Sequence, residues 1–136
     1  MRNKFYTTKS FQEALRGAVK LKGGLDRITD PMIITDEDGI ILFANEAVAQ
    51  RAGFTHGELI GKTPGELWGN NKDESFYEYM WQTIKVDKKP FTATNMVNRR
   101  RDGTYYGCDV RIYPVLDDDK NIAYFMGIES NYSDSI

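Results

Sequence analysis

The sequence predicts an α+β fold in which helices cover one face of a five-stranded antiparallel sheet. Three observations predict it. Two β-rich runs near the start are joined by an Asp-Gly turn, three more β-rich runs close the chain, and the helical segments lie between the two groups. Helices and strands grouped in this way place the helices on one side of an antiparallel sheet. With 136 residues, 40% of them hydrophobic, the chain suits one domain around one core.

The N-terminal segment predicts a separate amphipathic helix. Ser10 and Glu13 have the spacing of a capping box, in which each side chain binds the other residue's backbone amide. Apolar residues then recur at helical spacing over residues 11–22, and Gly23 and Gly24 end the pattern. We therefore expect a tail and cap helix over residues 1–24, before a domain over residues 25–134. The apolar stripe must pack on the sheet or pair with a copy of itself.

The first hairpin and the helices after it follow from local signals. Residues 31–36 and 40–45 predict two strands around an Asp-Gly turn. Asn45 suits the N-cap of a helix that Gly53 ends. Two short helices with capping boxes are expected after Thr55 and Thr63, and a longer helix runs from Asp73 to about Lys85.

The last three strands are predicted from residue 91 onward. Asp102-Gly103 between two β-rich runs predicts a hairpin with a two-residue turn, which requires positive φ. The strand over residues 105–115 contains Pro114, where we expect it to fray or bulge. An acidic turn separates it from a final strand over residues 122–130.

Charge and composition exclude several classes of partner. Eighteen basic and 20 acidic residues give a net charge of −2, which provides no field for nucleic acid or an anionic membrane. No apolar run approaches the roughly 18 residues of a membrane span, and the N-terminus lacks the apolar core of a signal peptide. A single cysteine cannot form an internal disulfide, which fits the cytoplasm.

The sequence does not indicate an enzyme. His56 is the only histidine and sits at a helix start, so neither a Ser-His-Asp nor a Cys-His set can be assembled. Gly61-Lys62-Thr63 lacks the earlier glycine of a phosphate-binding loop. The acids at residues 36–38 lack the ligand spacing of a calcium loop, so no metal site is predicted. These exclusions favour a binding or interaction module.

Four stretches together resemble the Per-Arnt-Sim (PAS) family. They are residues 34–45, residues 53–62, the Arg-Arg-Arg-Asp-Gly-Thr hairpin at 99–104, and Tyr-Phe-Met-Gly-Ile at 124–128. The resemblance covers residues 25–134 and implies a sheet of strand order 2-1-5-4-3 that grips a ligand cavity under its helices. It also implies a role in sensing and signal transduction, two-component systems included, usually joined to a kinase, cyclase or transcription output domain.

Within that family the chain is similar to the FAD-binding redox-sensor branch seen in the nitrogen-fixation regulator and in aerotaxis receptors. Met80-Trp81 and residues 97–100 carry this similarity. It implies that Trp81 packs beside the isoalloxazine ring, that the Asn98 amide meets the ring's N3–H and O2, and that Glu129 lies near N5 and O4. An amide offers the donor and acceptor that the flavin edge requires. The further cofactor-binding residues that we expect are Ile33, Thr35, Trp68, Met96, Cys108 and Phe125.

The sequence argues against two other cofactor types, a cysteinyl-flavin adduct and haem. A cysteinyl-flavin adduct needs a cysteine in a Gly-x-Asn-Cys-Arg motif, and the corresponding loop around residues 69–71 contains none. An axial histidine for haem is missing from the long helix over residues 73–85. Flavin without an adduct therefore remains, with no distinction between FAD and FMN beyond family analogy.

Structural roles for the same residues stay open. Trp81 at helical spacing suits a core position, Asn98 a turn cap, Glu129 a solvent-facing strand end and Cys108 a small buried filler. Large inward side chains would close the cavity, and Met96, Tyr106, Phe125 and Trp81 are the candidates. The alternative function is then a cofactor-free dimerisation module, or a sensor of a colourless metabolite. In either case we expect a homodimer through the helix over residues 11–22.

Overall fold

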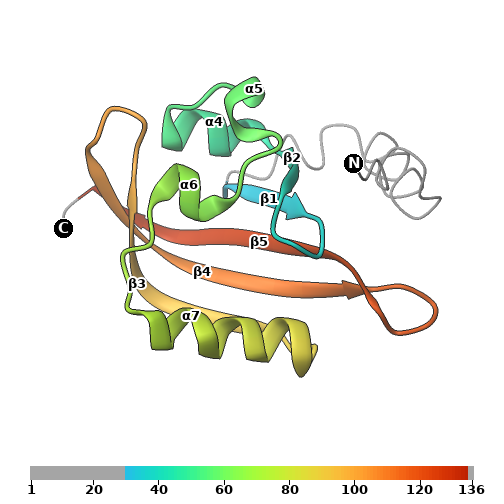
Figure 1. Ribbon diagram of the computed structural model, residues 1–136. Coiled ribbons are helices and arrows are strands. Elements are labelled where there is room, and N and C mark those ends of the chain that lie inside the picture. Colours follow the sequence, from blue (N-terminus) through green and yellow to red (C-terminus); the bar gives the residue numbers. More distant parts are fainter. Residues whose placement is uncertain (1–29, 135–136) are drawn as a thin grey trace.

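The computed structural model describes residues 30–134. The helix predicted over residues 11–22 and the boundary at residues 24–25 lie outside this part of the chain. The described residues form a five-stranded antiparallel sheet of order β2-β1-β5-β4-β3, which confirms the predicted fold and strand order. Its strands are β1 (Met32–Thr35), β2 (Ile41–Ala44), β3 (Phe91–Arg99), β4 (Tyr105–Leu116) and β5 (Ile122–Ser133). The long strands β4 and β5 run along the middle of the molecule (Figure 1).

Among residues 30–134 the helices lie between β2 and β3 in the sequence, as predicted for this part of the chain. They are α4 (Glu46–Ala52), α5 (His56–Leu59), α6 (Pro64–Trp68) and α7 (Glu74–Trp81). Capping boxes start α5 at Thr55 and α6 at Thr63, and the Asp73 side chain caps α7. Two-way capping is what allows helices of only four and five residues to form, because so short a helix has few internal hydrogen bonds.

Asn45 joins the first strand to the first helix. Its side-chain oxygen accepts from the Val48 amide at 3.2 Å, as a helix cap, and from the Met32 amide at 3.1 Å. Its Nδ2 donates to the Asp30 carbonyl at 3.0 Å. Asn45 is 2% exposed, so these hydrogen bonds replace the ones to water that its amide loses on burial.

The long helix ends in a turn that the sequence did not predict. After Trp81 the chain continues as a π-helical segment, η1 (Gln82–Val86). The Gln82 amide is shared between the Glu78 and Tyr79 carbonyls, and the Thr83 hydroxyl donates to the Tyr79 carbonyl at 2.8 Å. The predicted helical extent to about Lys85 is thus confirmed, with a wider last turn.

The β3–β4 hairpin lies where the sequence predicts it, but its turn is of a different type. The Gly103 amide donates to the Arg100 carbonyl at 3.0 Å, and the Arg100 amide donates to the Thr104 carbonyl at 2.7 Å. Within this turn, residues 100–104, only Gly103 has positive φ, at 89°. This is a three-residue loop with glycine at the bulge position, and the predicted two-residue turn is wrong. Pro114 stays paired with Phe125, and the nearer of the two register shifts between β4 and β5 lies between Val115 and Leu116.

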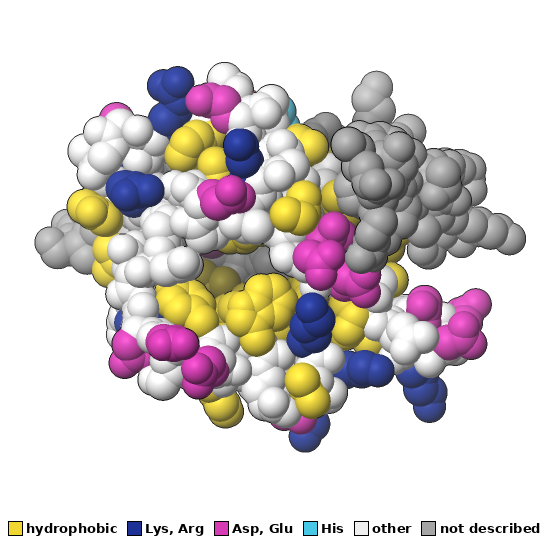
Figure 2. Space-filling model, in the orientation of Figure 1, with side chains coloured by type: hydrophobic (Ala, Val, Ile, Leu, Met, Phe, Trp, Pro, Cys, Tyr) yellow, Lys and Arg dark blue, Asp and Glu magenta, His cyan; other side chains and the backbone are white. Residues whose placement is uncertain are grey.

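The core divides into two clusters of buried side chains. One gathers around Ile41, Leu59 and Tyr106 beneath α4 to α6, and the other around Ile84 and Phe125 beneath α7. Met96 is partly buried against both clusters. The helices therefore do not form one continuous layer, and a hollow opens between α6 and α7 (Figure 2).

Candidate ligand-binding site

A cavity of about 380 Å³ lies between the sheet and helices α6 and α7. Its sheet wall carries alternate residues of the strands, and its other wall comes from α6, α7 and η1. Of the residues predicted to bind a cofactor, all but Cys108 line it: Ile33, Thr35, Trp68, Trp81, Met96, Asn98, Phe125 and Glu129. Met96, Phe125 and Trp81 border the space and leave it open, while Tyr106 lies buried beside it.

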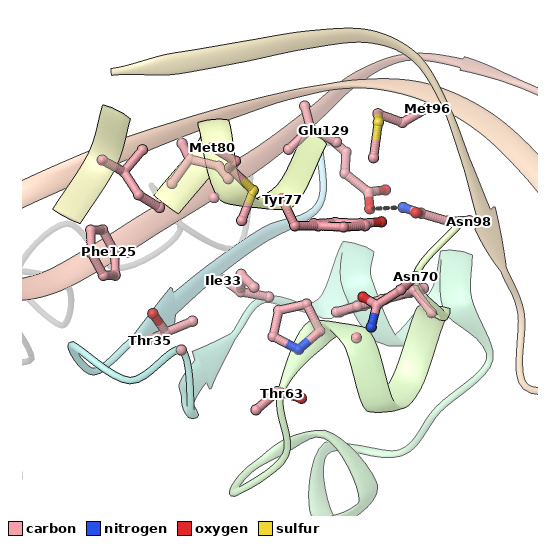
Figure 3. A pocket seen from close by; sticks show the side chains of 18 of the residues that line it. Ile33, Thr35, Thr63, Asn70, Tyr77, Met80, Met96, Asn98, Phe125 and Glu129 are labelled. Atoms are coloured by element: carbon pink, nitrogen blue, oxygen red, sulfur yellow. Dashed lines mark hydrogen bonds between the residues drawn. The ribbon is translucent and has the colours of Figure 1, made fainter. Parts of the chain in front are cut away.

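A polar cluster closes one end of this cavity. Asn98 comes from β3 and Glu129 from β5, and their side chains point toward one another (Figure 3). Asn98 Nδ2 donates to Glu129 Oε2 at 2.8 Å. The Tyr106 hydroxyl, from the intervening strand β4, donates to the same carboxylate at 3.0 and 3.1 Å. Thr35 and Phe125 lie at the opposite, less polar end (Figure 3).

Burial at the polar end changes the acidity of its groups. Desolvation raises the pKa of Glu129 from 4.5 to about 7, although hydrogen bonds from Tyr106 and Asn98 and the charge of Arg51 oppose the rise. The pKa of the Tyr106 hydroxyl is raised as well, mainly by burial and then by the nearby carboxylate. Glu129 can therefore change its protonation state near neutral pH, whereas Tyr106 stays a hydrogen-bond donor.

The geometry corrects three structural roles that the sequence left open. Glu129 is not solvent-facing, because its carboxylate points into the cavity and receives two side-chain donors. Asn98 caps no turn; it is 9% exposed and bonded to Glu129. Trp81 combines both predicted positions. It lines the cavity and also packs edge-on against Phe125, with ring centroids 5.8 Å apart.

Cys108 is the one predicted cofactor-binding residue that does not line the cavity, and its contact with a ligand stays a prediction. The side chain is 2% exposed and lies in the core behind Asn98, whose Nδ2 is 3.7 Å from the sulfur. Cys108 and Tyr106 alternate on β4 and are buried in the same core cluster, opposite Met96 and Asn98 of β3. Burial raises the pKa of the thiol, which matches an unreactive filler.

Further residues line the cavity that the sequence analysis did not predict to bind a cofactor. Thr63 and Asn70 approach it from the N-cap of α6 and the loop after that helix, and Tyr77 and Met80 from α7 (Figure 3). The apolar stripe on the long helix could have indicated that Tyr77 and Met80 face the cavity. No sequence feature indicates this for Thr63 and Asn70, because their approach to the cavity depends on how the short helices pack.

A chain of contacts leads from the polar end to the end of β5. The Tyr106 ring lies 5.7 Å from the ring of Tyr132, and the Arg100 guanidinium donates to the Tyr132 hydroxyl at 2.6 Å. Arg100 and Tyr132 both bond to Asp134. The Arg51 guanidinium also lies over the Tyr132 ring, 3.9 Å from its centroid. The cavity carboxylate is thereby connected to the last described residues.

Other kinds of site are not found within residues 30–134. No three histidine, cysteine or acidic side chains there lie close enough together to hold a metal ion. None of the helices in this part of the chain is long and apolar enough to cross a membrane.

The family follows from comparison with known proteins. A family profile described as "PAS domain" matches residues 29–134. The chain belongs to the PAS domain family. This agrees with the five-stranded sheet, its strand order and the cavity under the helices.

Individual relatives of this PAS domain are mostly signalling proteins by name. The nitrogen fixation regulatory protein of Klebsiella oxytoca is 28% identical over 100 residues, which are 74% of this chain and 20% of that protein. The blue-light photoreceptor of Listeria monocytogenes is 28% identical over 104 residues, covering 76% of this chain and 39% of the relative. This chain thus spans about a fifth to two fifths of these relatives.

The fold also matches a solved structure. An RNA-binding light-oxygen-voltage receptor superposes with a TM-score of 0.73 at 17% identity, over 85% of this chain and 33% of the receptor. At that identity the likeness concerns the fold alone.

Proposed function

We propose that this PAS domain is a sensory module that binds a flavin and relays a redox or light signal. The resemblance to the redox-sensor branch favours FAD as the flavin. The observation that carries the proposal is the polar end of the cavity. A buried amide and a carboxylate meet there above a mostly apolar space, which is the arrangement that orients a heteroaromatic ring. When bound, a flavin would supply the electron chemistry.

The chain's own residues fit such a ring. With Nδ2 of Asn98 bonded to Glu129, its carbonyl oxygen accepts no hydrogen bond from the residues that the structure describes and remains available to a ring N–H. Gly127 lines the cavity on β5 between Phe125 and Glu129. Lacking a side chain, it leaves room in the cavity wall beside Ile33, whose Cγ1 would lie 3.4 Å from a Cβ at position 127. A volume of about 380 Å³ is at the lower end of the roughly 300–1,000 Å³ range of ligand pockets.

The relay would start at Glu129. A change in the charge or orientation of this carboxylate alters the bonds from Tyr106 on the neighbouring strand β4 and from Asn98 on the next strand, β3. The contacts from Tyr106 to Tyr132, Arg100 and Asp134 would carry the change to the end of β5. From there it would reach an output domain or a signalling partner in the cytoplasm.

The test is the absorption spectrum of the purified chain, followed by the spectrum after incubation with FAD and removal of free flavin. Bound oxidised flavin is expected. Asn98→Ala and Trp81→Ala should each lower the flavin content, whereas Thr94→Ala, an exposed residue on β3, should not. A haem spectrum, or a colourless protein that takes up no flavin, would refute the proposal and favour the metabolite sensor or interaction module.

We also propose that the domain forms a homodimer through the helix over residues 11–22. The apolar stripe of Phe11, Leu15, Ala18 and Val19 supports it, because such a face requires a partner surface. Sedimentation of the full chain should give a dimer, and Leu15→Glu should give a monomer with an unchanged circular dichroism spectrum. A monomeric wild-type chain would contradict this proposal without affecting flavin binding.

A further inference from the structure

The charged side chains that line the cavity carry one sign. Among the described residues they are Asp38, in the turn between β1 and β2, and Glu129 at the polar end. The other polar lining side chains are uncharged: the hydroxyls and amides of Thr35, Thr63, Asn70, Tyr77 and Asn98, and the indole N–H groups of Trp68 and Trp81, of which Trp68 Nε1 has no hydrogen-bond partner among the described residues. A ligand in this cavity therefore meets two carboxylates and several neutral groups.

Nearby cations are already engaged with these acids from outside. Lys85 Nζ lies 3.9 Å from Asp38 Oδ1 and 5.8 Å from the centre of the Trp81 ring. Arg51 lowers the pKa of Glu129 through its charge, but its guanidinium stacks on the Tyr132 ring and does not line the cavity. Each cation offsets a carboxylate and does not turn the interior into an anion site.

The hydrogen bonds at the polar end add a second restriction. Nδ2 of Asn98 and the hydroxyl of Tyr106 both donate to Glu129, so these donors are used within the protein. What this end offers to a ligand is the Asn98 carbonyl oxygen and the carboxylate, both of them acceptors when Glu129 is ionised. An N–H edge is recognised by such a pair, whereas a phosphate brings only further negative oxygens.

We infer that the cavity selects the uncharged, N–H-bearing ring of its ligand and excludes phosphate, so that riboflavin binds about as tightly as FMN or FAD. This inference rests on the proposed flavin function. The ring and its neutral polyol chain meet the cavity, and the phosphate groups lie outside it, away from Asp38 and Glu129. Sites that select for a phosphate commonly place an arginine or a lysine against it, which makes affinity depend on ionic strength, and no such side chain lines this cavity among the described residues. The start of the five-residue helix α6, which borders the cavity, is capped by the Thr63 side chain.

The experiment is calorimetric titration of the full 136-residue chain with riboflavin, FMN and FAD at low and high ionic strength. Dissociation constants within about threefold of one another, with little salt dependence, are expected. Binding of FMN or FAD about tenfold or more tighter than riboflavin, weakened by salt, would overturn the inference.

Two charge variants test the cause. Asp38→Asn removes one lining carboxylate, and Asn70→Lys adds a cation at the cavity wall; both should favour FMN over riboflavin relative to the wild type. Asn121→Lys in the exposed β4–β5 turn makes the same charge change as Asn70→Lys away from the cavity and should leave the ratio unchanged. An unchanged ratio in both cavity variants would refute the electrostatic argument.

A further pair of probes separates this inference from the flavin proposal. If none of the three flavins binds, the flavin proposal fails, and the charge selection is then measured with neutral N-phenyl-1-naphthylamine against its sulfonated, anionic analogue. Tighter binding of the neutral dye would support selection against anions. Tighter binding of the sulfonate would overturn it.

Discussion

Replacing Glu129 by glutamine tests the buried carboxylate directly. Glutamine has nearly the same shape and can still accept the hydrogen bond from Tyr106, but it cannot ionise. In the wild type, the pKa of Glu129 is raised from 4.5 to about 7 in the folded protein. The folded state therefore holds the proton more tightly than the unfolded state, and the unfolding free energy falls as pH rises through this window.

The size of the effect follows from the same values. A pKa difference between 4.5 and about 7 corresponds to about 3 kcal/mol of unfolding free energy lost between acid and neutral pH when the cavity is dry, and to less when water enters it. The E129Q variant lacks this loss. At about pH 5 the two proteins should be of similar stability, and at about pH 8 the variant should be more stable by roughly 2–3 kcal/mol.

Urea denaturation followed by circular dichroism, on ligand-free protein at several pH values, measures this difference. The matched control is Glu78→Gln on the exposed side of α7, whose profile should follow the wild type. Parallel stability profiles for E129Q and wild type would refute the reasoning. They would mean that Glu129 is solvated in the folded protein and that the polar end carries no titratable switch near neutral pH.

Three further predictions concern the frame around the site. Asn45→Ala should lower the unfolding free energy measured by urea denaturation by about 2–4 kcal/mol, because it removes a helix cap and leaves the buried Met32 amide unpaired. Thr55→Ala, which removes an exposed cap only, should lower it by about 1 kcal/mol. Equal losses would contradict the double role of Asn45. Gly127→Ala, whose Cβ would make an ordinary contact of 3.4 Å with Ile33 Cγ1, should narrow the cavity and weaken flavin binding in calorimetry more than it changes stability; undiminished affinity would remove Gly127 from the ligand surface. Cys108 should react with a thiol reagent only at the rate of unfolding, and rapid reaction in the native state would show that the side chain is reachable.

Most of the fold could be predicted because its signals are local. The capping side chains at Asn45, Thr55, Thr63 and Asp73 act within three residues, so each could be recognised from the sequence alone. The type of the β3–β4 turn could not be, because Asp102-Gly103 suits both a two-residue and a three-residue loop. The pairing of the strands on either side of the turn selects between these two loop lengths.

The site was predicted unevenly for a similar reason. The positions of Asn98 and Trp81 came from family resemblance, and both line the cavity. Glu129 follows Phe125 and Gly127 at alternate positions of β5, so strand periodicity alone places it on the cavity face of the sheet. The sequence does not show which side chains its carboxylate meets there. The hydrogen bond from Tyr106 to Glu129 likewise joins residues that are 23 positions apart.

The positions of the two tryptophans have a practical consequence. Trp68 and Trp81 are the only tryptophans in the sequence, and they lie in the cavity wall on different helices. All of the intrinsic indole fluorescence of this protein therefore originates at the edge of the ligand space. A flavin entering that space would accept energy from both indoles, so quenching of the native emission would report occupancy without any label. Emission from Trp68→Phe and Trp81→Phe would then resolve which wall the ligand meets first.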